Sequence, residues 1–548
     1  MTISYAAGAT DIPLLGETIS ANLRRSVATY PTLEVLVDVV ADVRLTYAEF
    51  DVATDELAAG LLHLEVHKGD RVGIWAPNVA EWVLLQYATA KIGAILVNIN
   101  PAYRSDELIY ALNQSQVSVL VTLERFKTSE YRQMVESSMS QLPALRRVLY
   151  IDRGDIAELR AVGRQQGFDE VVTVERTLDF DDPINIQYTS GTTGRPKGAT
   201  LSHFNILNNG YFVGEMCHYT DADRICVPVP FYHTFGMVMG NLAATSHGAT
   251  IVIPAPSFEP HATLAAVESE RCTSLYGVPT MFIAELASED FARFDLSSLR
   301  TGIMAGSPCP VEVMKRVVSD MHMEQVTIAY GMTETSPVSC QTRTSDPLDK
   351  RIESVGTVHP HVEVKIVDAT GHVTERGVAG ELLTRGYSVM LGYWDDDEKT
   401  ALAIDKANWM HTGDVAIMDD DGYVYIVGRL KDMIIRGGEN IYPREIEEFL
   451  YTHPNIRDVS VIGVPDPTFG EVTMAWIILN EGVETSEEEI REFCRGKISH
   501  HKIPQYIKFV DAFPMTVTGK IQKYLMRRSA EEELHLDGST LYSTTPSP

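Results

Sequence analysis

The stretch that most constrains the fold is a glycine-rich run, YTSGTTGRPKG, from Tyr188 to Gly198. Ahead of it, Ile184 and Ile186 alternate with polar residues up to Tyr188, which predicts a strand that leads into a loop. Glycines let the main chain approach an anion closely, and successive N–H groups and hydroxyls can surround phosphate oxygens. Lys197 adds a positive charge. The run therefore predicts a phosphate-binding loop.

This run is not the P-loop of nucleoside triphosphatases. Counted from Gly191, that pattern requires glycine at 196 and serine or threonine at 198. The sequence has Pro196 and Gly198 at these positions. An ordinary flexible loop of glycine and threonine is the alternative interpretation.

Length, charge and cysteine spacing bound the class of protein. A chain of 548 residues is too long for one compact core and predicts at least two domains. The net charge of −29 argues against nucleic acid or an anionic membrane as main partner, since both would be repelled. Six cysteines without CxxC spacing predict reduced thiols, with neither a disulfide framework nor a zinc site.

Targeting and membrane signals are not visible. The first cation is Arg24, so no signal peptide is predicted. The apolar window 82–100 is broken by Gln86, Lys91 and Gly93 and falls short of a membrane span. We therefore expect a cytoplasmic protein with no integral membrane segment.

Between residues 45 and 180, strand-like and helix-like patterns alternate. The sequence predicts strands at 71–76, 94–98 and 117–121, with a helix capped by Asn78 and another at 106–112. Such alternation predicts an α/β architecture with parallel strands.

Four further motifs lie where strands are expected to end or turn. PVPFYHTFG places His233 between aromatic residues and a glycine turn. AGSP (305–308) and YGMTE (330–334) each follow an apolar segment, and open α/β sheets bind ligands at such strand ends. In WMHTGD, Asp414 follows a glycine turn, and its carboxylate can accept hydrogen bonds from both hydroxyls of a ribose. Capping of the turn is the alternative role for Asp414.

The composition shifts past residue 430. MIIRGGENIYPREIEE predicts a short strand, a glycine pair and a helix with Pro443 in its first turn. Ser486 and Glu489 predict a capping box. Lys520 lies on a glycine turn in PMTVTGKIQK, and the tail beyond it is of low complexity.

Taken in order from about Tyr47 to Lys523, these motifs resemble those of the adenylate-forming superfamily of acyl-CoA synthetases, peptide-synthetase adenylation domains and luciferases. The resemblance implies an α/β fold. A large N-terminal domain (1–430) of α/β subdomains, with a β-rich subdomain at 368–392, would precede a small mobile α+β domain (431–535) and a disordered tail (536–548).

The resemblance also implies a role for each motif. Lys520, His233, Thr193 and Glu334 would be catalytic, and Glu334 would hold Mg²⁺. Lys431 would be the hinge between the domains, and Gly437 and Gly438 would line the tunnel for CoA. ATP and AMP would be bound by Thr189, Ser190, Gly191, Thr192, Thr193, Gly194, Lys197, Gly306, Ser307, Tyr330, Gly331, Thr333, Asp414, Arg429 and Lys520.

The implied chemistry activates a carboxylic acid in two steps. The carboxylate attacks the α-phosphate of MgATP to give an acyl adenylate, and a thiol then displaces AMP. Such a site needs local positive charge in an acidic protein, and Lys197, Arg429 and Lys520 would supply it around one nucleotide.

A fatty acid of medium to long chain is the expected substrate. NPAYRSDEL, YGVPTMF, IRGGENIYPREIE and GKISHHKIP are most similar to bacterial fatty-acyl-CoA synthetases and mitochondrial medium-chain relatives. No acid occurs in 231–239, which argues against an amino acid. Met237 is expected to face the acyl chain with Tyr276 and Gly277 opposite, but core packing is an equally good interpretation of Met237 alone.

Three alternatives from other classes stay open. The protein could load the acyl group onto a carrier-protein thiol, be a non-catalytic binding paralogue, or act as a luciferase-like oxygenase. The expected partners are a fatty acid, ATP and CoA, with no nucleic acid, and the resemblance allows a homodimer. Chain length does not follow from the sequence.

Overall fold

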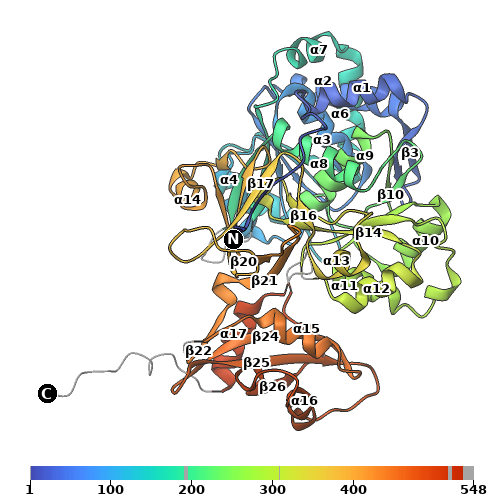
Figure 1. Ribbon diagram of the computed structural model, residues 1–548. Helices are drawn as coiled ribbons and strands as arrows, with labels where there is room; N and C mark the ends of the chain where they lie inside the picture. Colours follow the sequence, from blue (N-terminus) through green and yellow to red (C-terminus); the bar gives the residue numbers. More distant parts are fainter. Residues whose placement is uncertain (1, 190–195, 308, 438, 516–520, 535–548) are drawn as a thin grey trace.

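The computed structural model describes residues 2–189, 196–307, 309–437, 439–515 and 521–534. This part of the chain contains four β-sheets with helices packed against them. Three sheets belong to the larger body, and the fourth lies below it in Figure 1, in the orange and red C-terminal part. The arrangement confirms the expected α/β fold class with a large N-terminal and a small C-terminal domain.

The first sheet carries the glycine-rich run. Its strands follow the order β19-β9-β8-β5-β4-β6-β7, parallel from β8 to β7 and antiparallel at β9 and β19. The predicted strands near 71, 95 and 119 are all present, and β5 and β6 are buried throughout, as strands covered on both faces must be. The strands are β4 (Arg71–Trp75), β5 (Ile95–Asn98), β6 (Val119–Thr122), β7 (Arg147–Tyr150), β8 (Pro183–Thr189), β9 (Lys197–Ser202) and β19 (Gly392–Tyr393).

The second sheet is the larger of the two mainly parallel sheets. Its order is β16-β15-β14-β13-β12-β10-β11-β2-β3, parallel from β14 to β2. The main hydrophobic core contains residues of both sheets together with those of the helices between them. The strands are β2 (Glu34–Asp38), β3 (Val43–Thr46), β10 (Arg224–Cys226), β11 (Thr250–Ile253), β12 (Ser274–Gly277), β13 (Thr301–Ala305), β14 (Gln325–Gly331), β15 (Val338–Gln341) and β16 (Thr357–Val358).

The other two sheets are mainly antiparallel. The third has the order β1-β17-β18-β20-β21 and includes the predicted β-rich stretch. The fourth has the order β23-β22-β25-β24, with β26 added parallel to β25. Their strands are β1 (Tyr5–Ala7), β17 (Val362–Val367), β18 (Gly380–Gly386), β20 (Met410–Met418), β21 (Val424–Arg429), β22 (Ile434–Arg436), β23 (Glu439–Ile441), β24 (Ile456–Asp466), β25 (Gly470–Leu479) and β26 (Tyr506–Phe509).

Helices cover the sheets, and the one in the most apolar window, α3, lies inside the core. Every residue of α3 except Glu81 is buried, which explains its apolar character on all sides. Among the described residues, no helix is both long and apolar enough to cross a membrane. The helices are α1 (Ile19–Thr29), α2 (Tyr47–His63), α3 (Ala80–Ile92), α4 (Ser105–Gln114), α5 (Tyr131–Ser138), α6 (Asp155–Gln166), α7 (Asp169–Glu175), α8 (His203–Met216), α9 (Ala243–Ser246), α10 (Pro260–Glu270), α11 (Pro279–Leu286), α12 (Val311–Asp320), α13 (Leu348–Glu353), α14 (Asp397–Ala403), α15 (Pro443–Tyr451), α16 (Glu487–Cys494) and α17 (Lys523–Glu533), with short turns η1 (Met139–Gln141), η2 (Ile151–Arg153), η4 (Phe291–Arg293), η5 (Thr333–Thr335), η6 (Leu430–Asp432) and η7 (His500–Lys502), and a π-helix η3 (Phe235–Leu242).

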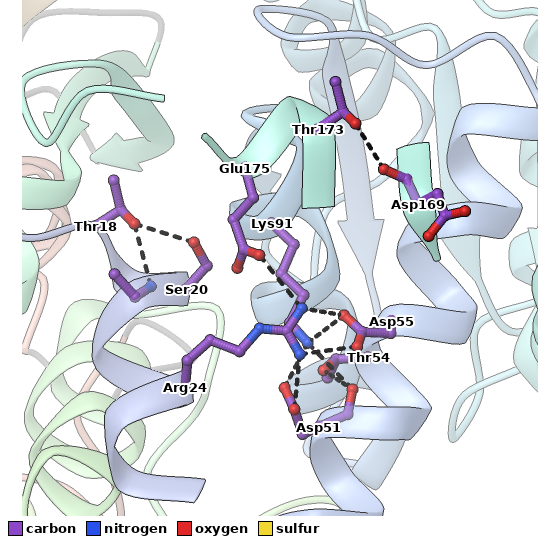
Figure 2. A network of polar contacts seen from close by, with 11 residues as sticks. Thr18, Ser20, Arg24, Asp51, Thr54, Asp55, Lys91, Asp169, Thr173 and Glu175 are labelled. Carbon is purple, nitrogen blue, oxygen red and sulfur yellow. Dashed lines mark hydrogen bonds and ion pairs between the residues drawn. The ribbon is translucent and has the colours of Figure 1, made fainter. Parts of the chain in front are cut away.

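A buried ion network holds four of these helices together (Figure 2). The ammonium of Lys91, which is fully buried in α3, lies 2.7 Å from Asp51 Oδ1 and 2.6 Å from Asp55 Oδ1, both on α2. Arg24 of α1 binds the same two carboxylates and reaches Glu175 of α7. Burial alone would raise the pKa of Asp55, but Arg24 and Lys91 hold that pKa below its ordinary value. Asp55 is therefore a charged partner of both cations at neutral pH.

Replacing Lys91 by methionine should lower the free energy of unfolding by about 3 kcal/mol or more, because buried Asp55 and half-buried Asp51 lose a cation. Chemical denaturation of the purified protein measures this change. Lys68→Met is the matched control: Lys68 pairs with Asp182 at 2.6 Å, but its side chain is 42% exposed. Its loss should cost at most about 1 kcal/mol. Equal losses in the two variants would contradict the importance of burial in the network.

Candidate active site

Three predicted motifs meet at one edge of the second sheet. Strands β12, β13 and β14 are adjacent and parallel, with Gly277 opposite Met304 and Ala305 opposite Ala329. Their carboxyl ends therefore place Gly277, Gly306 and Tyr330 side by side. Gly306 has φ +92°, a conformation that favours glycine, and Ser307 follows it half-buried. This edge is where α/β sheets bind ligands.

The candidate ribose carboxylate is held from two sides. Asp414 is buried, and its Oδ2 accepts a hydrogen bond of 2.7 Å from the Tyr330 hydroxyl. Arg429 pairs with Asp414 across strands β20 and β21, and its Nε lies 2.9 Å from Asp414 Oδ1. Burial, and then the charge of Asp414, raise the pKa of Tyr330, so its hydroxyl stays a donor. The structure thus brings together Tyr330, Asp414 and Arg429, three residues that the resemblance assigns to nucleotide binding.

The candidate metal ligand Glu334 lies in η5, just past the same strand. Both Glu334 and Thr333 are buried. The Tyr393 hydroxyl donates a 2.8 Å hydrogen bond to Glu334 Oε1. Gly331 closes the strand where no side chain fits, since a Cβ there would come within 1.8 Å of the main-chain oxygen of Pro337. No sequence motif pointed to Tyr393, which lies one residue past the β-rich stretch 368–392.

The predicted phosphate loop is described only at its two ends. Thr189 and Lys197 face each other as the last pair of the β8–β9 ladder. The Lys197 ammonium lies 4.8 Å from the ring centre of Tyr393. The Tyr110 hydroxyl donates to the main-chain oxygen of Pro196 at 3.0 Å. The predicted loop residues Ser190, Gly191, Thr192, Thr193 and Gly194 lie outside the described residues.

Asn78, the predicted helix cap, instead holds the segment that carries His233. Asn78 does not cap α3, whose N-cap is Val79 without a side-chain bond. Instead, buried Asn78 donates to the main-chain oxygen of Val229 at 2.9 Å and accepts from the Phe231 N–H at 2.8 Å. The capping prediction is therefore wrong, because a long-range contact satisfies this side chain. The motif signal pointed to a helix start and gave no sign of this role.

Of the three predicted acyl-pocket residues, Tyr276 and Gly277 are neighbours on β12, and Met237 lies in η3, the helix against which Tyr276 packs. Met237 is buried in η3, a π-helix that begins two residues after His233, and its sulfur accepts a 3.3 Å hydrogen bond from Asn98 Nδ2. Tyr276 stacks on Phe235 of the same helix and donates to the Met239 oxygen at 2.9 Å. Next to it, Gly277 leaves room for the ring of Phe282. π-Helical segments often lie at functional sites.

The C-terminal motifs are placed only in part. Lys431 lies in η6, which joins β21 of the third sheet to β22 of the fourth. Burial lowers its pKa, with a further contribution from Arg429. Gly437 has φ +60°, and its N–H donates to the Phe469 oxygen at 2.7 Å. Gly438, Lys520 and the predicted tail lie outside the described residues, and the boundary at 430/431 stays a prediction.

Comparison with known proteins identifies the family. The model of the AMP-binding enzyme matches residues 23–394, and that of the AMP-binding enzyme C-terminal domain matches 445–520. The chain belongs to the AMP-binding enzyme family. As the resemblance of the motifs predicted, the phosphate-loop run and YGMTE of this AMP-binding enzyme fall in the first match, and Lys520 ends the second.

Full-length relatives of this AMP-binding enzyme are known. It is 48% identical to YngI of Bacillus subtilis (strain 168), over 96% of this chain and 99% of that protein. It is 45% identical to the mitochondrial medium-chain acyl-CoA ligase ACSF2 of Danio rerio, over 98% and 92%. The solved structure of the anthranilate CoA ligase AuaEII in complex with anthranoyl-AMP matches with a TM-score of 0.84 at 27% identity, over 96% and 99%.

Proposed function

We propose that this AMP-binding enzyme is an ATP-dependent fatty acid–CoA ligase that forms an acyl adenylate and then an acyl-CoA of medium to long chain. The observation that carries the proposal is a pair of buried carboxylates, each of which accepts a hydrogen bond from a tyrosine hydroxyl. Asp414 accepts from Tyr330 at the end of β14, and Glu334, just past that strand, accepts from Tyr393 of β19. The relatives support the reaction class, since one is a medium-chain acyl-CoA ligase and another binds an acyl-AMP.

The chemistry needs positioning and charge stabilisation more than covalent catalysis. The substrate carboxylate oxygen bonds to the α-phosphorus of ATP and pyrophosphate leaves, after which the CoA sulfur bonds to the acyl carbon and AMP leaves. Asp414 would hold the ribose, and Lys197 with Lys520 would stabilise the negative charge that spreads over the phosphates. His233, seated by the segment that Asn78 holds, would lie against the reacting carboxylate.

Glu334 suits Mg²⁺, a hard cation that prefers oxygen ligands. Among the described residues, no group of three His, Cys, Asp or Glu side chains converges to hold a metal. This fits an ion bound by one carboxylate together with substrate phosphates. When bound, Mg²⁺ would neutralise phosphate charge, and Glu334 would be its protein ligand.

Location and assembly are part of the proposal. The six cysteines of the enzyme are free and buried, which supports a reducing compartment. We propose that this compartment is the cytoplasm. The Danio rerio relative is named mitochondrial, so fractionation of the native cells is the deciding measurement. A homodimer is proposed as the assembly, to be measured by analytical ultracentrifugation.

A panel of straight-chain carboxylic acids of increasing length tests the proposed function. The purified enzyme is given MgATP and each acid, and the AMP released is measured with and without CoA. We expect CoA-dependent turnover to peak among medium to long chains. AMP release that requires an acylatable carrier protein, and not CoA, would overturn the proposal, as would a peak at acetate or at aryl acids.

The acyl pocket can be tested at Met237. Met237→Ala should move the preferred length upward by a few carbons and Met237→Trp should move it downward, because Met237 would lie along the acyl chain. Neighbouring lengths should differ only modestly, since an extra methylene in an apolar pocket is worth about 1–3 kcal/mol. The measurement is the length profile of kcat/KM.

Met314→Ala provides the control for core packing. Met314 lies on α12, is fully buried, and belongs to a different hydrophobic core. This control should lower stability without changing the profile. Met237 variants whose profiles keep the wild-type shape at reduced height would show that Met237 is a packing residue.

A further inference from the structure

Tyr393 contacts two charged groups of opposite sign in the candidate site. Its hydroxyl donates a 2.8 Å hydrogen bond to Glu334 Oε1, and its ring centre lies 4.8 Å from the Lys197 ammonium. The side chain is buried, and the described residues show no ion pair between Lys197 and Glu334 themselves. The tyrosine therefore binds an anion and a cation that do not bind each other.

The main chain around Tyr393 is fixed on several sides. Strand β19 pairs with β9 so that Tyr393 is opposite Ala199. The Tyr393 N–H donates to Thr400 Oγ1 at 2.8 Å, and the Met390 N–H donates to the main-chain oxygen of Glu334 at 2.9 Å. The strand that holds the ring is thus attached both to the strand that follows the phosphate loop and to the turn that carries Glu334.

The chemistry of the phenol suits both contacts. A phenol hydroxyl is a hydrogen-bond donor, and that of Tyr393 donates to the Glu334 carboxylate. A hydrogen bond to an ionised carboxylate is stronger than one between neutral groups. The face of the ring is electron-rich and attracts an ammonium. One side chain can therefore orient both charges.

We propose that Tyr393 is a positioning residue of the adenylation site, whose hydroxyl orients Glu334 toward the metal and whose ring holds Lys197 toward the phosphates. The inference rests on the proposed function. Lys197 and Glu334 carry opposite charges and would attract each other if the ring between them were removed. A direct pair would turn both groups away from the nucleotide.

The experiment separates the hydroxyl from the ring. Tyr393→Phe removes only the hydroxyl, and Tyr393→Leu removes both. For each full-length variant, Mn²⁺ affinity in the presence of ATP is measured by electron paramagnetic resonance of the free ion, and ATP affinity is measured at saturating Mg²⁺ by calorimetry. Tyr87→Phe is the matched control. It also removes a buried tyrosine hydroxyl, which in α3 is hydrogen-bonded to Thr245 at 2.7 Å.

Y393F should weaken Mn²⁺ affinity by about tenfold, the lower end of the effect of removing a partner of a metal ligand. Its ATP affinity at saturating metal should stay within about twofold, because the ring still faces Lys197. Y393L should weaken both affinities by several-fold or more, and Y87F should weaken neither.

Glu334→Gln distinguishes two kinds of failure. If E334Q loses Mn²⁺ affinity while Y393F does not, the positioning role is overturned and the proposed role of Glu334 stands. If neither variant loses affinity, the metal-binding role of Glu334 fails and the inference fails with it. Melting temperatures of Y393F and Y87F, measured without ligand, check that a loss of affinity does not come from unfolding.

Discussion

Replacing Lys520 by alanine should reduce acyl-AMP formation by about a hundredfold or more, which is the scale of losing one electrostatic stabiliser of the transition state. The same variant should still convert supplied acyl-AMP and CoA into thioester, because the resemblance assigns the lysine to the first step alone. The described residues that flank its segment are anchored: Met515 bridges Ile521, and the Gln522 N–H donates to the Pro514 oxygen at 2.8 Å.

The two half-reactions must be measured separately. Pyrophosphate release from ATP and fatty acid reports the first step, and thioester formation from synthetic acyl-AMP reports the second. Lys508→Ala is the control, since this lysine of the same domain pairs with Glu533 instead. Losses of equal size in both half-reactions would contradict the assignment of Lys520.

Replacing Lys431 by proline should separate the two half-reactions in another way. Lys431 lies in η6, a 3₁₀ turn, whose φ of about −50° to −70° includes the value near −65° that proline imposes. Proline should therefore keep the present turn and oppose the change of main-chain angles that a domain rotation requires. We expect adenylation to be spared and thioester formation to be lost.

Lys431→Ala is the matched control, because it removes the ammonium and leaves φ free. Alanine should retain both half-reactions at near wild-type rates. Unchanged rates in the proline variant would place the hinge at another residue. Loss of both steps in both variants would instead indicate that the ammonium itself is required.

Local patterns were sufficient to predict much of the architecture. The alternation around Ile184 and Ile186 predicted β8, and the apolar segments ahead of AGSP and YGMTE are strands β13 and β14. Each of these signals depends on neighbouring residues, which the sequence displays directly. Asp414 and Tyr330 were predicted to bind the nucleotide from the resemblance of their motifs, and the structure adds that they contact each other.

Contacts between distant parts of the chain could not be predicted in this way. Lys91 was noted only as an interruption of an apolar window, yet it is fully buried because carboxylates of a different helix neutralise it. Asn78 has the sequence pattern of a cap, but its partners lie on the segment before His233. The sequence of the π-helix η3, which contains Met237, has no apolar periodicity that would distinguish it from an α-helix.

The pairing of β19 with β9 has a consequence for the synthesis of the protein on the ribosome. β19 is the outermost strand of the first sheet. Until residues 392–393 have been synthesised, β9 is therefore the edge strand of that sheet. At about 5–20 residues per second, translation leaves this edge uncovered for on the order of ten seconds or more. An unpaired edge can bind strands of other chains. The nascent protein therefore has a period of vulnerability to aggregation, in which a ribosome-bound chaperone would be of most use.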